Sequence, residues 1–554
     1  MAKVMALQKK RDPLIMAGTV AAVFSLVVRI PLLGSVGAEG VAYFAPVNEL
    51  FLLTIVFLGS GLCETMSQMM HYRIGRGQYR NAERVFIISR NTALIFCLLL
   101  ALLILFGSRY IAAVIFLEDL SRMALLMIVP AIILMTFTCL LRGYFQGMGS
   151  GYPAAHSLIL EKSFGIVFVI LGAAYFHEYG QKVAAIMHND SHAAAYGAFG
   201  AALGLAAAAL IAFLHLLIIY IMYRRTEKSN IYRDNSRGRE TPGYLYRSLL
   251  ALAMPMGVYM VMAQLGPLLN QRIFYHFAQR MNDSGTAYIN MAAEWGNYYG
   301  IYLVVIGILV AAVCMIFSKE SAEIAKTCIR GEQRPAQEQM QRTILYMLLA
   351  TVPVVILTAV LAEALVGALG AEDAALSKGL LQMGSALVFL LAFSLFWMDL
   401  LKQFKRKHSI GLLTAGALCV QLGLLYLLLG KASSGGQMIN LVVISNLAGA
   451  LVTFVGGFVI IHRIMGAGDW MKKCIRSLVV SLLCGAVIGL MSLLLSAVLL
   501  DKLGAAATLI ICPIVMAPIY LLLMSVLRGL SAAEADNLPG GQYLVRIGRK
   551  LRIW

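Results

Sequence analysis

Charged side chains inside long apolar stretches are the residues of this sequence that could do chemistry. Glu161 and Lys162 stand in an apolar run that begins near Tyr152 and follows Arg142. A charged side chain at membrane depth costs a few kcal/mol or more, so it normally faces a watery cavity or an opposite charge. If Pro153 opens a helix, Glu161 lies about 12 Å along it, close to the middle of a hydrocarbon core of about 30 Å. We therefore expect this helix to line a wet space.

The composition indicates that a membrane surrounds these charges. Of the 554 residues, 60% are hydrophobic and only 13% are charged, and the mean hydropathy is +0.81. Water-soluble cores cannot bury so large an apolar fraction. The formal net charge of +18 comes from short basic clusters between apolar runs. This pattern is typical of cytoplasmic loops, so we expect contact with membrane lipids and none with nucleic acid.

Apolar windows of spanning length predict an all-α polytopic membrane protein with fourteen transmembrane helices. These windows begin near Leu14, Phe44, Val85, Met123, Tyr152, Ala194, Ser248, Glu294, Thr343, Ser377, Ser409, Met438, Ile475 and Gly504. Every second connection is basic, from the amino terminus to the tail after Arg528, which predicts that both termini are cytoplasmic. The first run, from Pro13 to Leu33, is long enough to span and lacks an Ala-x-Ala site, so we interpret it as an anchor.

The two halves of the sequence resemble each other. Residues 76–82 and 330–336 share the pattern R-G-x-x-R-x-A, and Leu-Leu-Arg at 140–142 resembles Leu-Leu-Lys at 400–402. Six predicted helices separate each pair, an even number, so the halves should be pseudo-symmetric about an axis along the membrane normal. We predict an N-lobe of helices 1–6 (1–223), a basic cytoplasmic linker (224–247), a C-lobe of helices 7–12 (248–462), two extra helices (463–530) and a cytoplasmic tail (531–554).

An Arg/Glu couple is expected near the outer end of each lobe. Nearly the same spacing separates Arg29 from Arg272 as separates Glu49 from Glu294. Two interpretations stay open for each couple: a binding site, or a structural salt bridge with arginines that snorkel to the interface. For Arg29 we favour binding, and for Arg272 the structural bridge. Arg90 in helix 3 is a further buried-charge candidate.

Other polar positions narrow the chemistry. Glu161 and Lys162 are adjacent and leave their helix about 100° apart, so we expect Glu161 alone to face the cavity. The nine cysteines lie in apolar segments or inside loops, and we expect neither disulfides nor a cysteine metal site. An outer loop contains His188-x-Asp190-x-His192, a spacing that a metal could use, but we expect no metal there. The glycines of helix 6 (Gly197, Gly200, Gly204) are typical of close helix packing.

Several motifs together resemble one family. These are R-G-Y-F-Q-G from Arg142, a small-residue turn before Pro153 and Glu161, R-I-P from Arg29, and G-R-G-Q-Y-R-N-A-E-R-V-F from Gly75. They are similar to the lipid II flippase and stage V sporulation protein B branch of the multidrug/oligosaccharidyl-lipid/polysaccharide (MOP) exporter superfamily. The resemblance covers most of the chain, although residues 63–65 depart from a proline-containing motif of many relatives.

The resemblance implies a monomeric transporter of the bacterial cytoplasmic membrane, with no enzymatic activity and no cofactor. It would be an alternating-access flippase that moves an undecaprenyl-diphosphate-linked sugar, either lipid II or a polysaccharide unit for cell wall biogenesis, to the outer leaflet. A MATE-type multidrug or cation antiporter is the alternative, and a membrane-embedded glycan polymerase or ligase is less favoured. Asn270, where many relatives carry an aspartate, argues against sodium coupling.

A diphosphate favours arginine, because the planar guanidinium offers paired donors that lysine lacks. On this basis we predict two sets of functional residues, with no catalytic residue and no metal ligand. The substrate-binding set is Arg29, Arg90, Arg142, Glu161 and Arg272, and the gating or ion-pair set is Glu49, Glu294 and Lys162.

Overall fold

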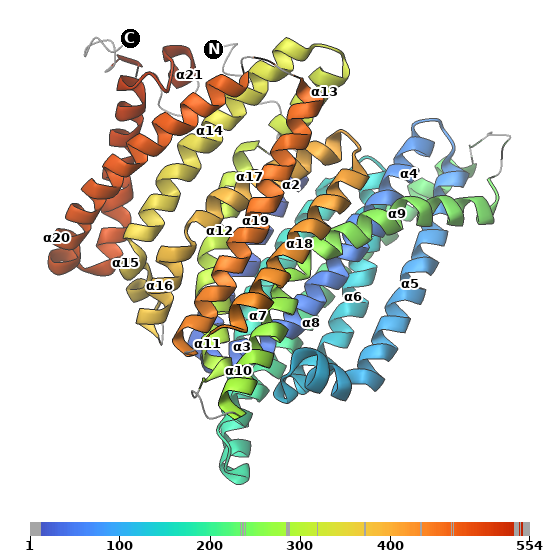
Figure 1. Cartoon of the computed structure of the whole chain (residues 1–554). Helices are drawn as coiled ribbons and strands as arrows, with labels where there is room; N and C mark the ends of the chain where they lie inside the picture. The colour runs from blue at the N-terminus through green and yellow to red at the C-terminus, as the bar shows by residue number, and fades with distance from the viewer. Residues whose placement is uncertain are drawn as a thin grey trace. The chain divides into compact units, whose positions relative to one another are not determined.

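A computed structural model describes residues 13–536 together with 542 and 545–546, except for 233, 235–237, 239, 284–288, 318, 371–372, 433–434, 467 and 469. Every regular element in these residues is helical, which confirms the predicted all-α class (Figure 1). Twelve helical segments of the described chain are long and apolar enough to cross a membrane. The protein is therefore a multi-pass membrane protein.

Two of the twelve segments contain a break. The segment Met16–Ile74 includes Gly37 at φ 73°, and the segment Trp470–Val526 includes Gly504 at φ 81°. A positive φ interrupts a right-handed helix, and glycine adopts it without a Cβ clash. Division of both segments at these glycines agrees with the predicted helices, although the count of fourteen stays a prediction.

The chain forms two compact units, which are described separately. Unit 1 contains residues 1–300 and 414–442, and unit 2 contains 301–413 and 443–554. The lobe boundaries drawn from the sequence stay a prediction. Unit 1 contains α2 (Pro13–Val27), α3 (Arg29–Val56), the π-helix η1 (Phe57–Cys63), α4 (Glu64–Ile74), α5 (Tyr79–Tyr110), α6 (Arg122–Gly147), α7 (Tyr152–Met187), α8 (Ser191–Tyr232), α9 (Pro242–Gln264), α10 (Gly266–Asp283), α11 (Met291–Asn297) and most of α18 (Lys407–Leu429).

Close packing of α7 on α8 positions the charged residues of α7. A Cβ at Gly200 would overlap the backbone carbonyl of Gly172, and one at Gly204 would overlap the backbone at Phe168. Only glycine permits such an approach, so the packing role predicted for Gly200 and Gly204 is confirmed. Their close contact fixes the rotation of α7 and hence the direction in which Glu161 points.

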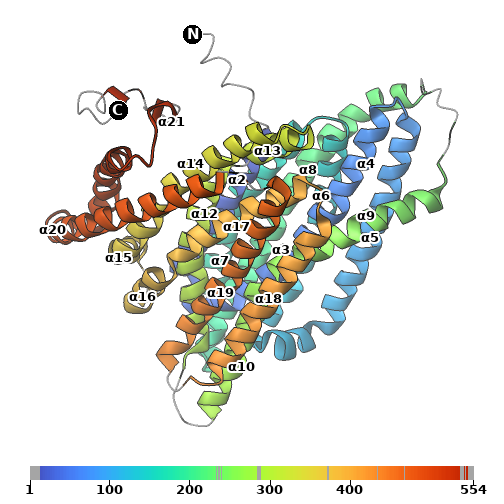
Figure 2. The same ribbon diagram turned by 45° about the horizontal axis from the view of Figure 1, so that its top comes forward.

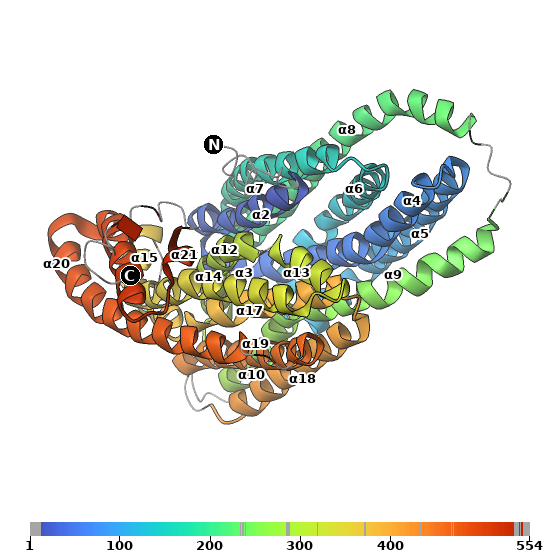
Figure 3. The same cartoon turned by 90° about the horizontal axis from the view of Figure 1, so that it is seen from above.

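Part of the predicted linker docks on the turn between α4 and α5. Arg73 forms an ion pair of 2.6 Å with Glu240, the backbone N–H of Arg80 donates to Asp234 over 2.8 Å, and the Asn81 amide donates to the Gly238 carbonyl over 2.9 Å. Figure 3 shows the ends of α4 and α5 between α8 and α9. Two acidic residues of this basic segment, Asp234 and Glu240, thus bind residues of the basic loop 73–84.

The R-G-x-x-R-x-A pattern builds the same turn twice. Gly77 and Gly331 have φ of 73° and 85°, and the residues that follow cap α5 and α14 (Gln333–Val360) with φ/ψ of −90°/64° and −82°/69°. A residue with positive φ is the usual way to end one helix and begin another at an angle. The repeat inferred from the letters is therefore present in the local backbone.

Unit 2 is built around α14 and the long helix α20 (Trp470–Val526). The two arms of α20, drawn orange and red, form a hairpin (Figure 2). Its buried core includes Cys484, Ile488, Cys512 and Tyr520. The other helices of unit 2 are α12 (Leu303–Phe317), α13 (Glu320–Ile329), α15 (Ala362–Leu369), α16 (Ala374–Gly384), α17 (Ala386–Gln403), most of α19 (Gly435–Met465) and α21 (Ala532–Asp536).

Candidate substrate cavity

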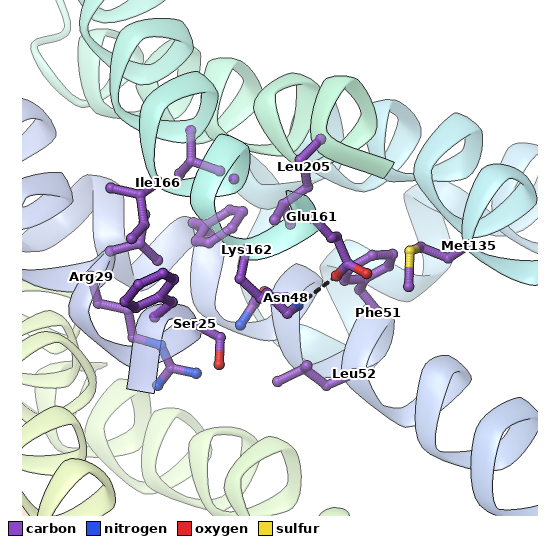
Figure 4. Close-up of a pocket in the computed structure, with 16 residues that line it drawn as sticks. Ser25, Arg29, Asn48, Phe51, Leu52, Met135, Glu161, Lys162, Ile166 and Leu205 are labelled. Atoms are coloured by element: carbon purple, nitrogen blue, oxygen red, sulfur yellow. Dashed lines mark ion pairs between the residues drawn. The ribbon is translucent and has the colours of Figure 1, made fainter. Parts of the chain in front are cut away.

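A small cavity of about 50 Å³ lies within unit 1, between α2, α3, α6, α7 and α8. Its wall is mostly apolar and includes Phe24, Phe44 and Phe51. The polar side chains of the wall converge on one region (Figure 4), and they are Ser25, Arg29, Asn48, Glu161 and Lys162. An apolar wall with a few convergent polar groups is the usual form of a ligand site.

Glu161 of α7 joins two cations. One carboxylate oxygen lies 2.8 Å from Nη2 of Arg142, and the other lies 2.7 Å from Nζ of Lys162. Arg142 also donates from Nε to the Ser157 hydroxyl over 2.8 Å. The exposed fractions of the Glu161, Arg142 and Lys162 side chains are 5%, 12% and 18%. This geometry brings together Arg142 and Glu161, both predicted to bind substrate.

The expectation that only Glu161 of the adjacent pair faces the cavity is wrong. Both Glu161 and Lys162 line it, and they form an ion pair with each other. The angle of about 100° applies to the directions in which the two side chains leave the helix. A lysine stem of four methylenes is long enough to bend back across that angle. Side-chain length therefore outweighs helical phase here.

Arg29 and Glu49 form the predicted couple, with Arg29 Nη2 and Glu49 Oε1 3.5 Å apart and side-chain exposures of 7% and 4%. Tyr299 donates its hydroxyl proton to Glu49 over 2.7 Å and accepts a hydrogen bond from Asn48 over 2.8 Å. The Arg29 guanidinium lies 3.8 Å from the centre of the Tyr299 ring. Gln264 donates to the second Glu49 oxygen over 3.2 Å.

Three of these partners were not found from the sequence: Asn48, Tyr299 and Gln264. Their only signal in the sequence was a polar side chain within or next to a predicted spanning segment. Tyrosines and glutamines occur there too often for this signal to identify these residues. The Arg29 Nε atom is buried and has no hydrogen-bond partner within the described residues. A buried donor without a partner is rare in folded proteins, and its cost is recovered if a ligand oxygen accepts from it.

The remaining predicted residues lie elsewhere. Arg90 is exposed and donates to its neighbour Asn91, so it does not line this cavity. Arg272 has no ion pair among the described residues. The predicted second couple, Arg272 with Glu294, is therefore not formed. A similar sequence separation of the two arginines and of the two glutamates does not determine where their side chains point when the helices between them are interrupted. Glu294 lies in the first turn of the short helix α11.

The amides and the outer loop add two observations. Gln421 donates a hydrogen bond to the side-chain carbonyl oxygen of Asn270 over 3.3 Å. Asn270, where many relatives are expected to carry an aspartate, is therefore paired with a second amide side chain. In the described chain, no group of three His, Cys, Asp or Glu residues is arranged to hold a metal ion. The spacing His188-x-Asp190-x-His192 therefore does not become a metal site in this part of the structure.

The charged cluster, defined as Arg29, Arg142, Lys162, Glu49 and Glu161, is positive as a whole. Three ion pairs join its members into two groups, and the two groups meet at the cavity wall through Arg29, Glu161 and Lys162. With three cations and two carboxylates, this described set carries one more positive than negative charge. The low dielectric around it makes that difference stronger than on a surface.

The fold defines a multi-pass membrane protein with charges buried among its helices. The family model named MatE matches residues 13–171, the stretch that contains the whole charged cluster. This part of the chain is therefore similar to the MatE family.

Individual relatives agree with this assignment. Stage V sporulation protein B of Bacillus subtilis (strain 168) is 25% identical over 244 residues, which span 44% of this chain and 44% of that protein. The match thus covers less than half of the relative. Among solved structures, the lipid II flippase MurJ in an inward closed conformation has a TM-score of 0.62 at 13% identity, over 93% of this chain and 98% of MurJ.

Two further structures have the same fold. An inward-facing multidrug resistance MATE family transporter has a TM-score of 0.60 at 17% identity, over 80% of this chain and 95% of that one. A MOP superfamily transporter from Pyrococcus furiosus Vc1, described as having a binding pocket of reverse polarity, has a TM-score of 0.54 at 17% identity, over 83% and 98%. At these identities the structural likeness shows the fold alone.

Proposed function

We propose that this protein is an alternating-access flippase that moves an undecaprenyl-diphosphate-linked sugar, lipid II or a polysaccharide unit, from the inner to the outer leaflet. The observation that carries the proposal is the surplus of positive charge in the buried charged cluster. A diphosphate in a low-dielectric passage needs such a surplus, because an uncompensated charge there is very costly. The similarity to stage V sporulation protein B and to the MurJ fold supports the same class of substrate.

Two side chains in the cavity wall are suited to phosphate. Arg29 is held by the Tyr299 ring and by Glu49, while its buried Nε atom is left to donate. Lys162 needs only to swing its ammonium group away from Glu161 to reach a ligand. Arg29 then supplies a fixed planar donor, and Lys162 supplies a mobile point charge. Arg142, which also donates to Ser157, keeps Glu161 in place throughout.

The size of the cavity requires a conformational step. A volume of about 50 Å³ holds one or two water molecules, whereas ligand pockets usually measure about 300–1,000 Å³. The helices around the charged cluster must therefore separate before a lipid-linked sugar can enter. A state that alternates between this closed cavity and a wider one is what alternating access demands. We further propose that both chain ends face the cytoplasm of a bacterial cell and that one chain suffices.

A MATE-type cation antiporter is the second candidate, favoured by the similarity to the MatE family and by the two buried carboxylates. Both carboxylates already have cationic partners: Glu161 contacts Arg142 and Lys162, and Glu49 contacts Arg29. A cationic drug would have to displace one of them.

The test is transport by the purified chain in sealed vesicles. Vesicles that contain a fluorescent undecaprenyl-diphosphate-linked sugar report its arrival in the opposite leaflet, and a cationic dye tests the antiporter in parallel. We expect lipid-linked sugar to move, and Arg29→Ala and Lys162→Ala each to slow it at least about tenfold, the equivalent of about 1.4 kcal/mol.

The matched control is Arg109→Ala, which removes an exposed arginine at the end of α5 and should leave the rate unchanged. Uptake of the dye without movement of the sugar would favour the antiporter. Loss of sugar movement in all three variants would show that the charge of the whole protein matters, and that the charged cluster does not.

A further inference from the structure

A second polar cavity, of about 490 Å³, lies wholly within unit 2. The first arm of the α20 hairpin lines it, together with α14, the turn after α20 and the start of α21. The side chains that could contact a ligand are Gln341, Lys473, Arg476, Ser477, Arg528 and Ser531. Nothing in the proposed transport function uses this cavity.

The cavity wall is strongly basic. Lys473, Arg476 and Arg528 have no ion pair among the described residues. One carboxylate, that of Glu534, also lines the wall, but it accepts hydrogen bonds from the N–H and hydroxyl of Ser531 over 3.0 and 2.6 Å. The wall therefore contains three cations and one carboxylate, and one oxygen of that carboxylate already accepts two hydrogen bonds from Ser531.

The turn after α20 positions one of these cations. Arg528 has φ 54°, a left-handed conformation that is unfavourable for a non-glycine residue. The next residue, Gly529, packs closely against the first arm: a Cβ atom at this position would lie 2.6 Å from the side chain of Val480. The strained turn thus brings Arg528 against the arm that carries Lys473 and Arg476.

The surface next to the cations is apolar. Ile475, Val479, Leu482 and Leu483 on the first arm are 50–57% exposed, and Val526 on the second arm is 54% exposed. In a spanning hairpin these side chains face acyl chains. Lys473 and Arg476 lie within the first two turns of α20, and Arg528 lies two residues beyond its end at Val526. The cations are therefore at the level where a headgroup meets its acyl chains.

We propose that this cavity, which we call the α20 pocket, binds the phosphate headgroup of a two-chain anionic phospholipid of the surrounding membrane. Arg476, Arg528 and Lys473 hold the phosphate, while Gln341 and Ser477 offer hydrogen bonds to the glycerol backbone. The acyl chains lie along the exposed apolar side chains of α20. Basic pockets between transmembrane helices recognise anionic headgroups in this way, and the apolar surface beside the cations favours a lipid over a soluble anion.

The experiment measures lipid retained by the purified full-length chain. The protein is placed in nanodiscs of equal parts phosphatidylglycerol and phosphatidylcholine, extracted into mild detergent, and its bound lipids are counted by native mass spectrometry. The parent protein should retain phosphatidylglycerol in preference. The triple variant Lys473→Ala/Arg476→Ala/Arg528→Asn should retain about tenfold less, a value that allows for the partial exposure of the cations. Asparagine is chosen at 528 because it tolerates the left-handed conformation.

Two comparisons make the result decisive. The triple variant Lys326→Ala/Arg330→Ala/Arg334→Ala removes three exposed charges of unit 2 outside the α20 pocket and should retain phosphatidylglycerol as the parent does. Arg476→Lys/Arg528→Lys, which keeps the charge and the fold, should retain most of it. Equal retention in the α20-pocket variant and the parent would overturn the proposal. So would equal loss in both triple variants, or displacement of the lipid by millimolar inorganic phosphate, which would identify a soluble-anion site.

Discussion

Removal of Arg29 and Glu49 together should cost much less stability than the sum of the two single removals. The pair is 93% and 96% buried by side chain, and loss of one partner from a buried pair typically costs about 3–5 kcal/mol, because the remaining charge is unpaired. Two features place this pair at the lower end. Its atoms are 3.5 Å apart, and Glu49 keeps the hydrogen bonds from Tyr299 and Gln264.

These contacts give expected magnitudes for a double-mutant cycle. Arg29→Ala should cost about 3 kcal/mol, because a buried carboxylate loses its cation. Glu49→Gln should cost about 2 kcal/mol, since Arg29 keeps its position over the Tyr299 ring. The double variant should also cost about 2 kcal/mol, so the coupling energy is about 3 kcal/mol, at the upper end for residues in direct contact. Denaturant unfolding of each purified variant measures these values.

Transport separates a binding residue from a structural one. Arg29→Ala should fold but not transport, and Arg29→Lys should retain little activity, because the ammonium group lacks the planar donor pair. The double variant should regain stability and still fail to transport. If it regains transport, Arg29 is only a structural partner of Glu49, and the binding role falls to Arg142 and Lys162.

The exposed pair Lys378–Glu363 provides the control for the cycle. Its atoms lie 2.6 Å apart, but its side chains are 39% and 63% exposed. Exposed pairs are typically worth about 0–1 kcal/mol. A coupling energy for Arg29–Glu49 no larger than that of this pair would contradict the argument from burial.

Two further predictions concern stability. Burial raises the pKa of Glu118, in the loop between α5 and α6, from 4.5 to about 7, with smaller contributions from Asp119 and Glu39. A raised folded-state pKa gives stability that is complete below pH 4.5 and is lost as pH rises through 7, so the parent should lose up to about 3 kcal/mol between pH 5 and 8 that Glu118→Gln does not lose. The same dependence of the unfolding free energy on pH in both proteins would contradict this. Gly200→Ala should destabilise the protein by about 1–3 kcal/mol, because the new methyl group would overlap the backbone of α7. Gly34→Ala, whose methyl group meets nothing within 4 Å, should be neutral or slightly stabilising. Equal melting temperatures of the two variants would show that α7 and α8 can separate freely.

Helices and their turns could be predicted from the sequence because their signals are local. Spanning helices follow from apolar length, and the turn at Gly77 and Gly331 follows from a pattern that needs a positive φ at glycine. The pairing of Arg142 with Glu161 was also within reach, since the two lie on consecutive helices joined by a short turn. Signals of this kind need no knowledge of how distant segments pack.

The rest of the site depends on features that a sequence does not display. Two π-helical segments, η1 (Phe57–Cys63) and η4 (Tyr298–Tyr302), interrupt the helices after Glu49 and at Tyr299. A π-turn contains an extra residue, so it rotates everything that follows out of the 3.6-residue phase on which facing arguments rest. Tyr299 reaches Glu49 from 250 residues away, and no local pattern announces such a contact. The same limit explains why Arg272 and Glu294 were wrongly paired.

The sign of the substrate follows from what each ligand would have to break. A cation that bound Glu161 would displace Lys162 or Arg142 from contacts of 2.7 and 2.8 Å. Opposite charges about 4 Å apart attract by about 4 kcal/mol at an effective dielectric constant of 20. The displaced cation would forfeit an energy of this order and would remain in a tight apolar cavity.

An anion meets no such obstacle. It adds a partner to Arg29, whose buried Nε atom has none among the described residues, and it lets Lys162 exchange one negative neighbour for another. Glu161 meanwhile keeps Arg142, so neither carboxylate is stranded. Each step thus conserves the number of ion pairs and lowers the net charge of the charged cluster toward zero. The arrangement therefore favours an anionic ligand, which is the sign of charge that the proposed lipid-linked substrate carries.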